Sequence, residues 1–302
     1  MDPRRSAFRP RTDPPVSTFK NDTRGWKDPP SEMVWRPDGR TTHLKGSFSG
    51  QCAFLVGGGP SLRNVDLTPL NGRGIFTMAM NNAWCLLRPN AWVAVDPPEK
   101  FHSAGWADPA ILKFVPGTYA QAHTRRREGD AFARWMPVRS HPNVVFFRRT
   151  NGFDPSTFFT EESAQWGTLK GTTDALGLTQ NRTVMLAALK ILHWMGFSSV
   201  FLLGVDFNMP ISGSPYAFDE DKDAGGRRHN NSLYAVTTKR LAALKRWGDT
   251  HGARWPIYNC NPDSALRLYP FRSLSDAIDT ATTHTRREGD TLGWYAKEEP
   301  RA

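Results

Sequence analysis

The segment CAFLVGGGPSL at residues 52–62 constrains the fold more than any other part of the chain. Its first half is a continuous apolar run, as in a buried strand, and its second half joins three glycines to a proline and a serine. Glycine lacks a Cβ and lets the backbone turn tightly, while proline suits the first turn of a helix. The segment therefore predicts a strand, a glycine turn and a helix that begins near Ser61, whose N-terminal N–H groups favour a phosphate.

Further apolar runs alternate with helical segments along the chain. This alternation predicts an α/β fold, a Rossmann-like and mostly parallel sheet with flanking helices and a lid-like insertion. The strands are expected at residues 53–56, 74–78, 91–95, 111–115, 144–147, 200–203 and 257–258. The helices are expected at residues 183–194, 232–250 and near 273–280, with a long polar loop at 210–231.

The glycine turn alone does not distinguish a nucleotide site from a simple connection between a strand and a helix, because it matches neither G-x-G-x-x-G nor G-x-x-x-x-G-K-[ST]. The ends of later strands favour a site. Asn81 and Asn82 follow the second predicted strand and Asp96 follows the third, and ligands of open α/β sheets bind where the strands end. Asp206 follows the strand at 200–203, where a carboxylate needs a partner such as a ribose diol or a capping backbone.

Composition divides the chain into three parts. Residues 1–48 are rich in proline and charge and predict a disordered basic arm. Residues 49–280 form the predicted nucleotide-binding domain, in which the irregular stretch 118–180 is interpreted as an insertion or lid. Residues 281–302 predict a polar tail.

Charge and cysteine content limit the class of protein. The net charge of +10 allows a polyanionic partner such as nucleic acid, anionic lipid or acidic glycan, although no predicted helix carries a basic stripe interleaved with aromatic residues. The three cysteines, Cys52, Cys85 and Cys260, lack the spacing of a metal site and predict reduced thiols in a cytoplasmic protein. No apolar run reaches the roughly 18–20 residues of a membrane span.

Several motifs, taken in order, resemble a known superfamily. They are VGGGPSL at 56–62, the pair Asn81/Asn82, Asp96, the unit from 183 to 207 that ends in GVDF, YAFD at 216–219, the helix with Tyr234, and IYNCNPDSAL at 257–266. Over roughly residues 50–275 the chain resembles the superfamily that joins the bacterial family-42 sialyltransferases to the 6-hydroxymethylpterin diphosphokinase-like (DUF115) proteins. YAFD, the Tyr234 helix and the last motif are similar to the sialyltransferases alone.

The resemblance implies a lid that closes over a CMP-sugar donor, with no metal required. The nucleotide-binding residues that it implies are Gly57, Gly58, Gly59, Ser61, Asn81, Asn82, Asp96, Thr183, Gly204, Asp206 and Phe207. The glycines would cradle the nucleotide, and Asn81 or Asn82 together with Asp96 would contact cytidine or ribose. Tyr216 matches one of two tyrosines that hydrogen-bond the leaving phosphate.

Two positions depart from the family pattern. The second leaving-group tyrosine is Asn208 here, and the general-base histidine that should follow Tyr234 is replaced by Thr237. The nearest histidine is His229, a candidate base because histidine titrates near neutral pH, and it competes with the interpretation of a solvated loop tip. The catalytic candidates are Tyr216, Tyr234 and His229, with Arg227 and Arg228 as candidate phosphate ligands.

Three functions follow from these features. The leading one is an inverting glycosyltransferase that moves a sugar from a nucleotide-sugar to a hydroxyl of a glycan, a lipid or a nucleic acid. The second is a pterin-type diphosphokinase, which would need ATP and Mg²⁺ and would make the acidic DEDKD segment Asp219–Asp223 important. The third is a nucleotide-binding module without catalysis. We interpret the acidic segment as a solvated loop rather than as a metal site.

Overall fold

The computed structural model describes residues 31–124, 136–179 and 181–283. Most of the predicted basic arm and nearly all of the predicted polar tail lie outside these residues. None of the helices in the described part of the chain combines the length and the apolar character needed to cross a membrane.

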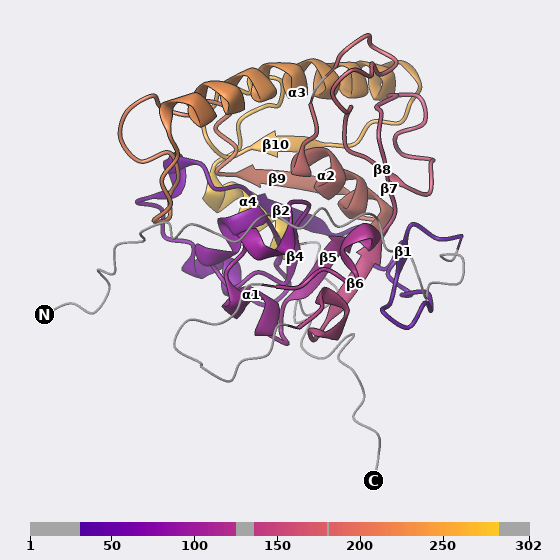
Figure 1. Ribbon diagram of the computed structural model, residues 1–302. Helices are drawn as coiled ribbons and strands as arrows, with labels where there is room; N and C mark the ends of the chain where they lie inside the picture. The colour runs from indigo at the N-terminus through magenta and orange to yellow at the C-terminus, as the bar shows by residue number, and fades with distance from the viewer. Residues whose placement is uncertain (1–30, 125–135, 180, 284–302) are drawn as a thin grey trace, which may run out of the picture.

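An eight-stranded sheet forms the centre of the molecule, with the strand order β1-β6-β5-β4-β3-β2-β9-β10 (Figure 1). All neighbours are parallel except β1, which pairs antiparallel with β6. The strands are β1 Val34–Trp35, β2 Cys52–Val56, β3 Phe76–Met80, β4 Ala91–Val93, β5 Leu112–Pro116, β6 Val144–Phe147, β9 Ser199–Leu203 and β10 Ile257–Asn259. The predicted Rossmann-like α/β fold is confirmed.

Alternate residues of each strand pack on opposite faces of the sheet, which gives three layers. In β2, Ala53 and Leu55 pack with the helices α2 and α3, whereas Phe54 and Val56 pack in the layer that contains α1 and α4. The helices are α1 Ser103–Ala107, α2 Val184–Met195, α3 Ala224–Thr250 and α4 Leu274–Thr283. Short 3-10 helices lie at η1 Pro60–Leu62, η2 Thr68–Asn71, η3 Asn81–Cys85, η4 Pro98–Lys100, η5 Gly117–Tyr119 and η6 Val138–Ser140.

The winding of the sheet reverses between β2 and β9. From β2 the chain adds β3, β4, β5 and β6 in turn on one side, and it later returns to place β9 and β10 on the other side of β2. The connections that contain α2 and α3 lie on one face, and η1 and η2 lie on the other. Ligands of open α/β sheets bind at such a switch point, where the parallel strands end.

Residues 31–48 belong to the folded domain, so the predicted arm was wrong for this stretch. β1 adds to the edge of the sheet, and Met33, Leu44 and Phe48 are almost fully buried in the core. The run is too short to show periodicity, and the prolines and charges around it dominate the local composition.

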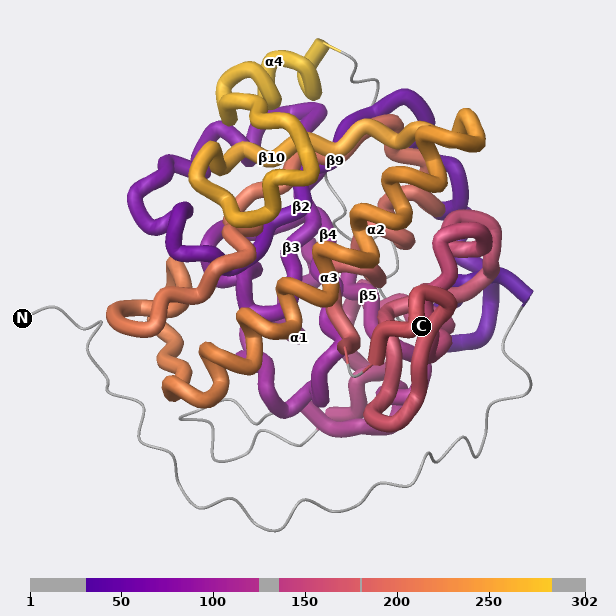
Figure 2. Tube along the Cα trace, turned by 90° about the horizontal axis from the view of Figure 1, so that it is seen from above, coloured from indigo at the N-terminus to yellow at the C-terminus, as the bar shows by residue number. Residues whose placement is uncertain are grey.

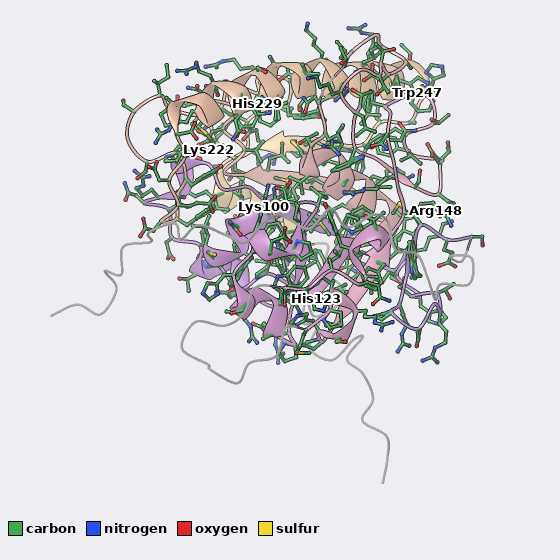
Figure 3. The ribbon with its side chains drawn as sticks, in the orientation of Figure 1. Lys100, His123, Arg148, Lys222, His229 and Trp247 are labelled. Atoms are coloured by element: carbon green, nitrogen blue, oxygen red, sulfur yellow. The ribbon has the colours of Figure 1, made fainter. Side chains whose placement is uncertain are left out.

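The helix α3 begins eight residues before its predicted start at 232. Asp223 caps it by accepting a hydrogen bond from the backbone N–H of Gly226 at 2.7 Å. Seen from above, α3 runs across the sheet on the outside of the molecule (Figure 2). Lys222, just before the helix, and Trp247, near its end, mark its extent in Figure 3. The residues from 224 to 231 therefore lie on a helix and not on a loop.

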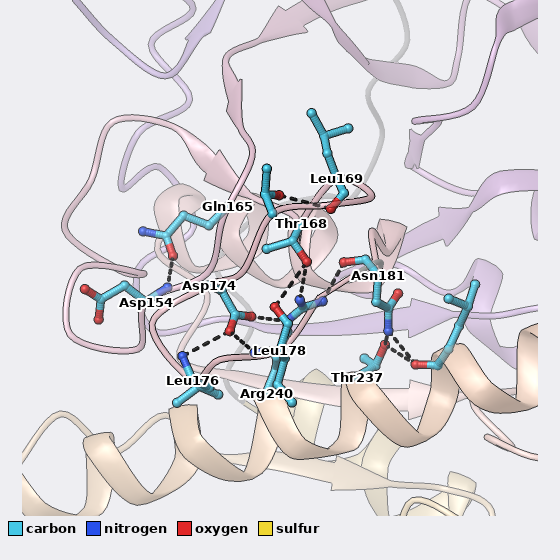
Figure 4. A network of polar contacts seen from close by, with 12 residues as sticks. Asp154, Gln165, Thr168, Leu169, Asp174, Leu176, Leu178, Asn181, Thr237 and Arg240 are labelled. Carbon is cyan, nitrogen blue, oxygen red and sulfur yellow. Dashed lines mark hydrogen bonds and ion pairs between the residues drawn. The ribbon is translucent and has the colours of Figure 1, made fainter.

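The insertion over the sheet is shorter than predicted, because β6 and η6, which lie within 118–180, belong to the main domain. What leaves the sheet is the stretch 148–182, which contains the two-stranded pair β7 Arg149–Thr150 and β8 Ala164–Gln165. This stretch is fixed to α3 through Arg240, whose guanidinium donates to Asp174, to the carbonyl of Asn181 and to the hydroxyl of Thr168 (Figure 4).

Candidate functional site

The glycine turn after β2 packs directly against the loop after β9. The N–H of Gly57 donates to the carbonyl of Leu203 at 2.7 Å, and that of Gly59 donates to the carbonyl of Gly204 at 2.8 Å. A Cβ on Gly57 would lie 2.6 Å from the carbonyl oxygen of Gly204, and a Cβ on Gly59 would lie 2.5 Å from the carboxyl group of Asp206. Glycine is therefore required at both positions by the protein's own backbone and side chains.

The carboxylate of Asp206 joins three loops at the ends of β2, β9 and β10. It accepts from the N–H of Ser61 at 2.9 Å, from the hydroxyl of Ser61 at 2.6 Å and from the amide of Asn261 at 2.9 Å. Of the two partners that the sequence allowed for Asp206, this geometry provides the capping backbone.

The expected helix after the glycine turn is only the three-residue 3-10 helix η1. The carboxylate of Asp206 bonds to the N–H of Ser61, which is one of the groups expected to hold a phosphate. The predicted helix start is therefore present as a single short 3-10 turn, and its Ser61 N–H is bonded within the protein.

Asn81 and Asn82 follow β3, the neighbour of β2, and contain buried amide oxygens. Within residues 31–124, 136–179 and 181–283, neither side-chain oxygen has a hydrogen-bond donor. Asn81 has a φ of 49°, a left-handed conformation that asparagine tolerates, and its carbonyl accepts from the indole N–H of Trp92 at 2.7 Å. The amide of Asn82 donates to Glu220 at 2.6 Å. Buried polar atoms of native proteins are rarely left without a partner, so each of these two oxygens lacks a donor that a native protein would normally supply.

The segment YAFD lies over Gly58. The rings of Tyr216 and Phe218 stack with 5.0 Å between their centroids, and the N–H of Ala217 donates to the carbonyl of Gly58 at 3.0 Å. A Cβ on Gly58 would lie 2.7 Å from the Phe218 ring. Burial raises the pKa of Tyr216 to about 12, and the nearby carboxylate of Glu220 is the next cause.

Tyr234 on α3 lies close to Tyr216. Its ring stacks on that of Phe207 with 5.0 Å between centroids, and Phe207 has a φ of 53°. Burial raises the pKa of Tyr234 to about 12, followed by the influence of Tyr216 and Asp206. Both tyrosines therefore keep their protons at neutral pH and can donate hydrogen bonds to an anion.

Asp96 follows β4 and is next to Val95, whose carbonyl accepts from the guanidinium of Arg149 at 3.3 Å. The guanidinium of Arg149 lies 4.0 Å from the centroid of Trp166, and that of Arg182 lies 4.8 Å from the same ring. Sequence reasoning missed this pair of arginines. The run RRTNG directly after the strand at 144–147 was the available signal for Arg149.

Thr183 caps α2 and accepts from the N–H of Met185 at 3.2 Å. Because α2 precedes the parallel strand β9, its N-terminus lies at the edge where the strands end. Thr183 is thus at the predicted edge of the sheet.

Arg227, Arg228 and His229 do not form the predicted catalytic and phosphate-binding group. Arg227 is buried, and its guanidinium donates to the carbonyls of Lys222, Pro210 and Gly213 and to the carboxylate of Asp221. Arg228 and His229 are exposed on the first turns of α3. His229 is labelled in Figure 3.

His229 is separated from the tyrosines of the candidate site because it is not on the face of α3 that turns inward. Asn230 and Tyr234 share this face at a spacing of four residues, and both are close enough to Tyr216 for one side chain to act on the pKa of the other. His229 lies about 100° away from Asn230 around the helix axis. The predicted roles of Arg227 as a phosphate ligand and of His229 as the base are both disfavoured by this arrangement.

The acidic residues before α3 have separate structural partners. Glu220 accepts from Asn82, Asp221 pairs with Arg227, and Asp223 caps the helix. In the described part of the chain no group of three or more His, Cys, Asp or Glu side chains is arranged to hold a metal ion. These carboxylates position the loop against β3 and α3.

Comparisons with known proteins give two similar solved structures. No protein-family model matches the chain, and no curated protein matches it. One structure is the sialyltransferase CstII from Campylobacter jejuni in complex with the substrate analogue cytidine-5′-monophosphate, with 15% identity over 83% of this chain and 94% of that chain and a TM-score of 0.38. The other is the sialyltransferase CST-II in complex with a trisaccharide acceptor and CMP, with 14% identity over 82% and 95% and a TM-score of 0.38. A TM-score of this size does not establish a shared activity, and the resemblance to the diphosphokinase-like proteins remains a prediction.

Proposed function

We propose that this protein is a glycosyltransferase that binds a nucleotide-sugar where β2, β3 and β9 end. The donor that we propose first is a CMP-sugar. The observation that carries the proposal is the pair of buried amide oxygens on Asn81 and Asn82, which have no donor among the described residues. An exocyclic amine of a base or a ribose hydroxyl would supply the missing hydrogen bonds.

The two tyrosines support transfer with a departing phosphate. Tyr216 and Tyr234 come from the loop after β9 and from α3, and both are protonated at neutral pH. Hydroxyl groups aimed at a leaving phosphate stabilise the negative charge that develops there. Tyr234 thereby supplies the second hydroxyl that the sequence lacks at Asn208.

The proposed reaction is a single inverting displacement. The acceptor oxygen forms a bond to the anomeric carbon, while the bond from that carbon to the phosphate oxygen breaks and its electron pair leaves with the nucleoside phosphate. A base takes the acceptor's proton. Glu220 is bonded to Asn82, so we assign this role to the carboxylate of Asp96, which lies just after β4 at the edge where the parallel strands end.

A thermal-shift panel with CMP, CDP, UDP, GDP and ATP, each with and without Mg²⁺, tests the nucleotide site. A ligand at 100 times its Kd stabilises the native state by about 2.7 kcal/mol. We expect CMP or CDP to raise the unfolding temperature without Mg²⁺. A shift with ATP and Mg²⁺ alone would instead support the diphosphokinase.

Turnover of CMP-sugars tests the reaction itself. Asp96→Asn should keep the thermal shift with CMP and lower kcat about 100-fold or more, because it removes the base and retains the side-chain shape. A variant that loses nucleotide binding and kcat together would place Asp96 on the ribose and not on the acceptor. If CMP raises the unfolding temperature but no CMP-sugar is turned over, the protein is a nucleotide-binding module without catalysis.

A further inference from the structure

The outer side of α3 carries a row of cations that the proposed nucleotide site does not use. Arg228, Lys239 and Arg246 are all exposed. They are separated by eleven and seven residues, a spacing that places them on one side of an α-helix. With a rise of 1.5 Å per residue, they lie about 16 Å and about 10 Å apart along the helix axis. The row was not evident in the sequence, because the helix was predicted to begin after Arg228.

The helix surface between these cations carries only small side chains. The residues at the intervening positions on the same side are Ser232, Ala235 and Ala242. His229 and Trp247 lie near the two ends of the row in Figure 3. Small side chains between spaced cations allow the backbone of a polymer to approach the helix closely.

Acidic side chains do not neutralise the row. The single acidic residue of α3 is Asp249, which pairs with Lys245 at 2.6 Å and with Arg254 at 3.2 Å. In the part of the chain that the structure describes, no ion pair involves Arg228, Lys239 or Arg246. The charge of the row is therefore available to a partner.

The residue types of the row, and of the helix around it, favour a phosphate polymer over a membrane surface as the partner. A helix that lies on a membrane inserts large apolar side chains, whereas the apolar residues Leu241 and Leu244 of α3 are buried against the sheet. Guanidinium groups bind phosphates in a bidentate manner, and a row of separated cations matches a polymer with repeated phosphates. We propose that the row Arg228–Lys239–Arg246 binds the phosphate backbone of a nucleic acid strand.

The row lies on the side of α3 opposite to the candidate site. Arg228 is two residues before Asn230, about 200° away around the helix axis, so it faces away from the side that carries Asn230 and Tyr234. Binding of a strand along the row therefore does not depend on the proposed function.

Fluorescence anisotropy with a labelled 20-nucleotide single strand, repeated with the corresponding duplex, tests the row in the full chain. We expect Lys239→Glu combined with Arg246→Glu to weaken binding at least tenfold at about 100 mM salt, and to reduce the slope of log K against log salt by about 1.4 for the single strand. The matched control is Arg73→Glu combined with Arg139→Glu, which makes the same change in net charge at exposed positions before β3 and β6. The control should bind within about twofold of the unchanged protein.

Three outcomes would overturn the proposal. The first is equal loss in the two double variants, which would show an effect of net charge alone. The second is an unchanged salt slope in the Lys239/Arg246 variant, and the third is binding to heparin or to anionic vesicles without binding to either oligonucleotide. Failure here is separable from failure of the nucleotide site, because the Lys239/Arg246 variant should retain the thermal shift with CMP. The Asn81→Gly variant should lose the thermal shift with CMP and keep its affinity for the oligonucleotide.

Discussion

The carboxylate of Asp174 and the guanidinium of Arg240 form an ion pair, 2.7 Å long, in which neither side chain exposes any surface to solvent. Asp174 also accepts from the N–H groups of Leu176 and Leu178, at 3.0 and 2.9 Å. The pair therefore joins the turn of the insertion to α3 (Figure 4).

Removing one member of this pair should be costly. Arg240→Met leaves the Asp174 carboxylate buried without its cation, so we expect the free energy of unfolding to fall by about 3–5 kcal/mol. Combining Arg240→Met with Asp174→Leu should recover most of the loss. Urea unfolding measures the free energy of unfolding of the single and the double variant. The control is Lys245→Met, which breaks the exposed pair with Asp249 and should lose less than about 1 kcal/mol. A loss that small for Arg240→Met would show that the insertion is not held by this pair.

The tyrosine hydroxyls should act on the rate more than on nucleotide affinity. We expect Tyr216→Phe and Tyr234→Phe each to lower kcat about 100-fold, because the lost hydrogen bond forms mainly to the charge that develops on the phosphate. Steady-state kinetics and the thermal shift with CMP separate the two effects. Tyr258→Phe is the control, since that ring stacks on Phe201 in the other layer. An equal fall in kcat for all three variants would refute a role at the phosphate.

Alkaline pH should destabilise the fold through the same two tyrosines. Their pKa is about 12 in the folded protein and about 10 in an unfolded chain. Above pH 10 the unfolded state loses protons that the folded state retains, so stability is full below pH 10 and falls as pH rises toward 12. Denaturant unfolding from pH 8 to 11.5 measures this slope, which should be shallower when both tyrosines are phenylalanine. An identical slope would mean that the two hydroxyls are solvated.

Gly59 should be intolerant of even a methyl group. Its φ of −61° and ψ of 145° are open to any residue, but a Cβ would lie 2.5 Å from the Asp206 carboxyl carbon. We expect Gly59→Ala to cost about 1–3 kcal/mol of stability through overpacking. Gly225→Ala in the first turn of α3 is the control and should be neutral or stabilising by up to about 1 kcal/mol. Thermal unfolding compares the two, and similar values would contradict the packing argument.

His229 should be dispensable for the reaction. It is exposed on α3 and lies away from the face that carries Tyr234. We expect His229→Ala to change kcat less than twofold at any pH between 6 and 9. A large loss, or a shift of the acidic limb of the pH profile, would restore this histidine as the base in place of Asp96.

The strands were predictable because each buried strand is a continuous run of apolar residues in the sequence. β2, β6 and β9 match the expected strands within one residue at each end, and α2 is shifted by one. Parallel strands buried on both faces need apolar residues at every position, so the pattern is strong and local. The N-terminus of α3 was missed because Gly225, Gly226 and the polar run after them suggest a loop, while the cap at Asp223 depends on its geometry.

The arrangement of the site was only partly predictable. The sequence indicated that the residues after β2, β3 and β9 would meet, and the structure places Gly59 and Asp206 against each other. It could not indicate that Ser61 would bond to Asp206, because such a contact depends on the distance between loops far apart in the chain. Arg149 and Trp166 come together for a similar reason, since their contact depends on the path of the insertion.

Arg227 braces the loop after β9 from inside. Its guanidinium donates to the carbonyls of Pro210, Gly213 and Lys222, which lie in the loop or directly before α3. The loop is fastened to the rest of the domain at a few points, where Ala217 bonds to Gly58, Glu220 bonds to Asn82 and Arg63 donates to the carbonyl of Tyr216. A chimera that exchanged residues 208–231 for a foreign loop would therefore carry its internal bracing with it and would need compatible residues chiefly at positions 58, 63 and 82.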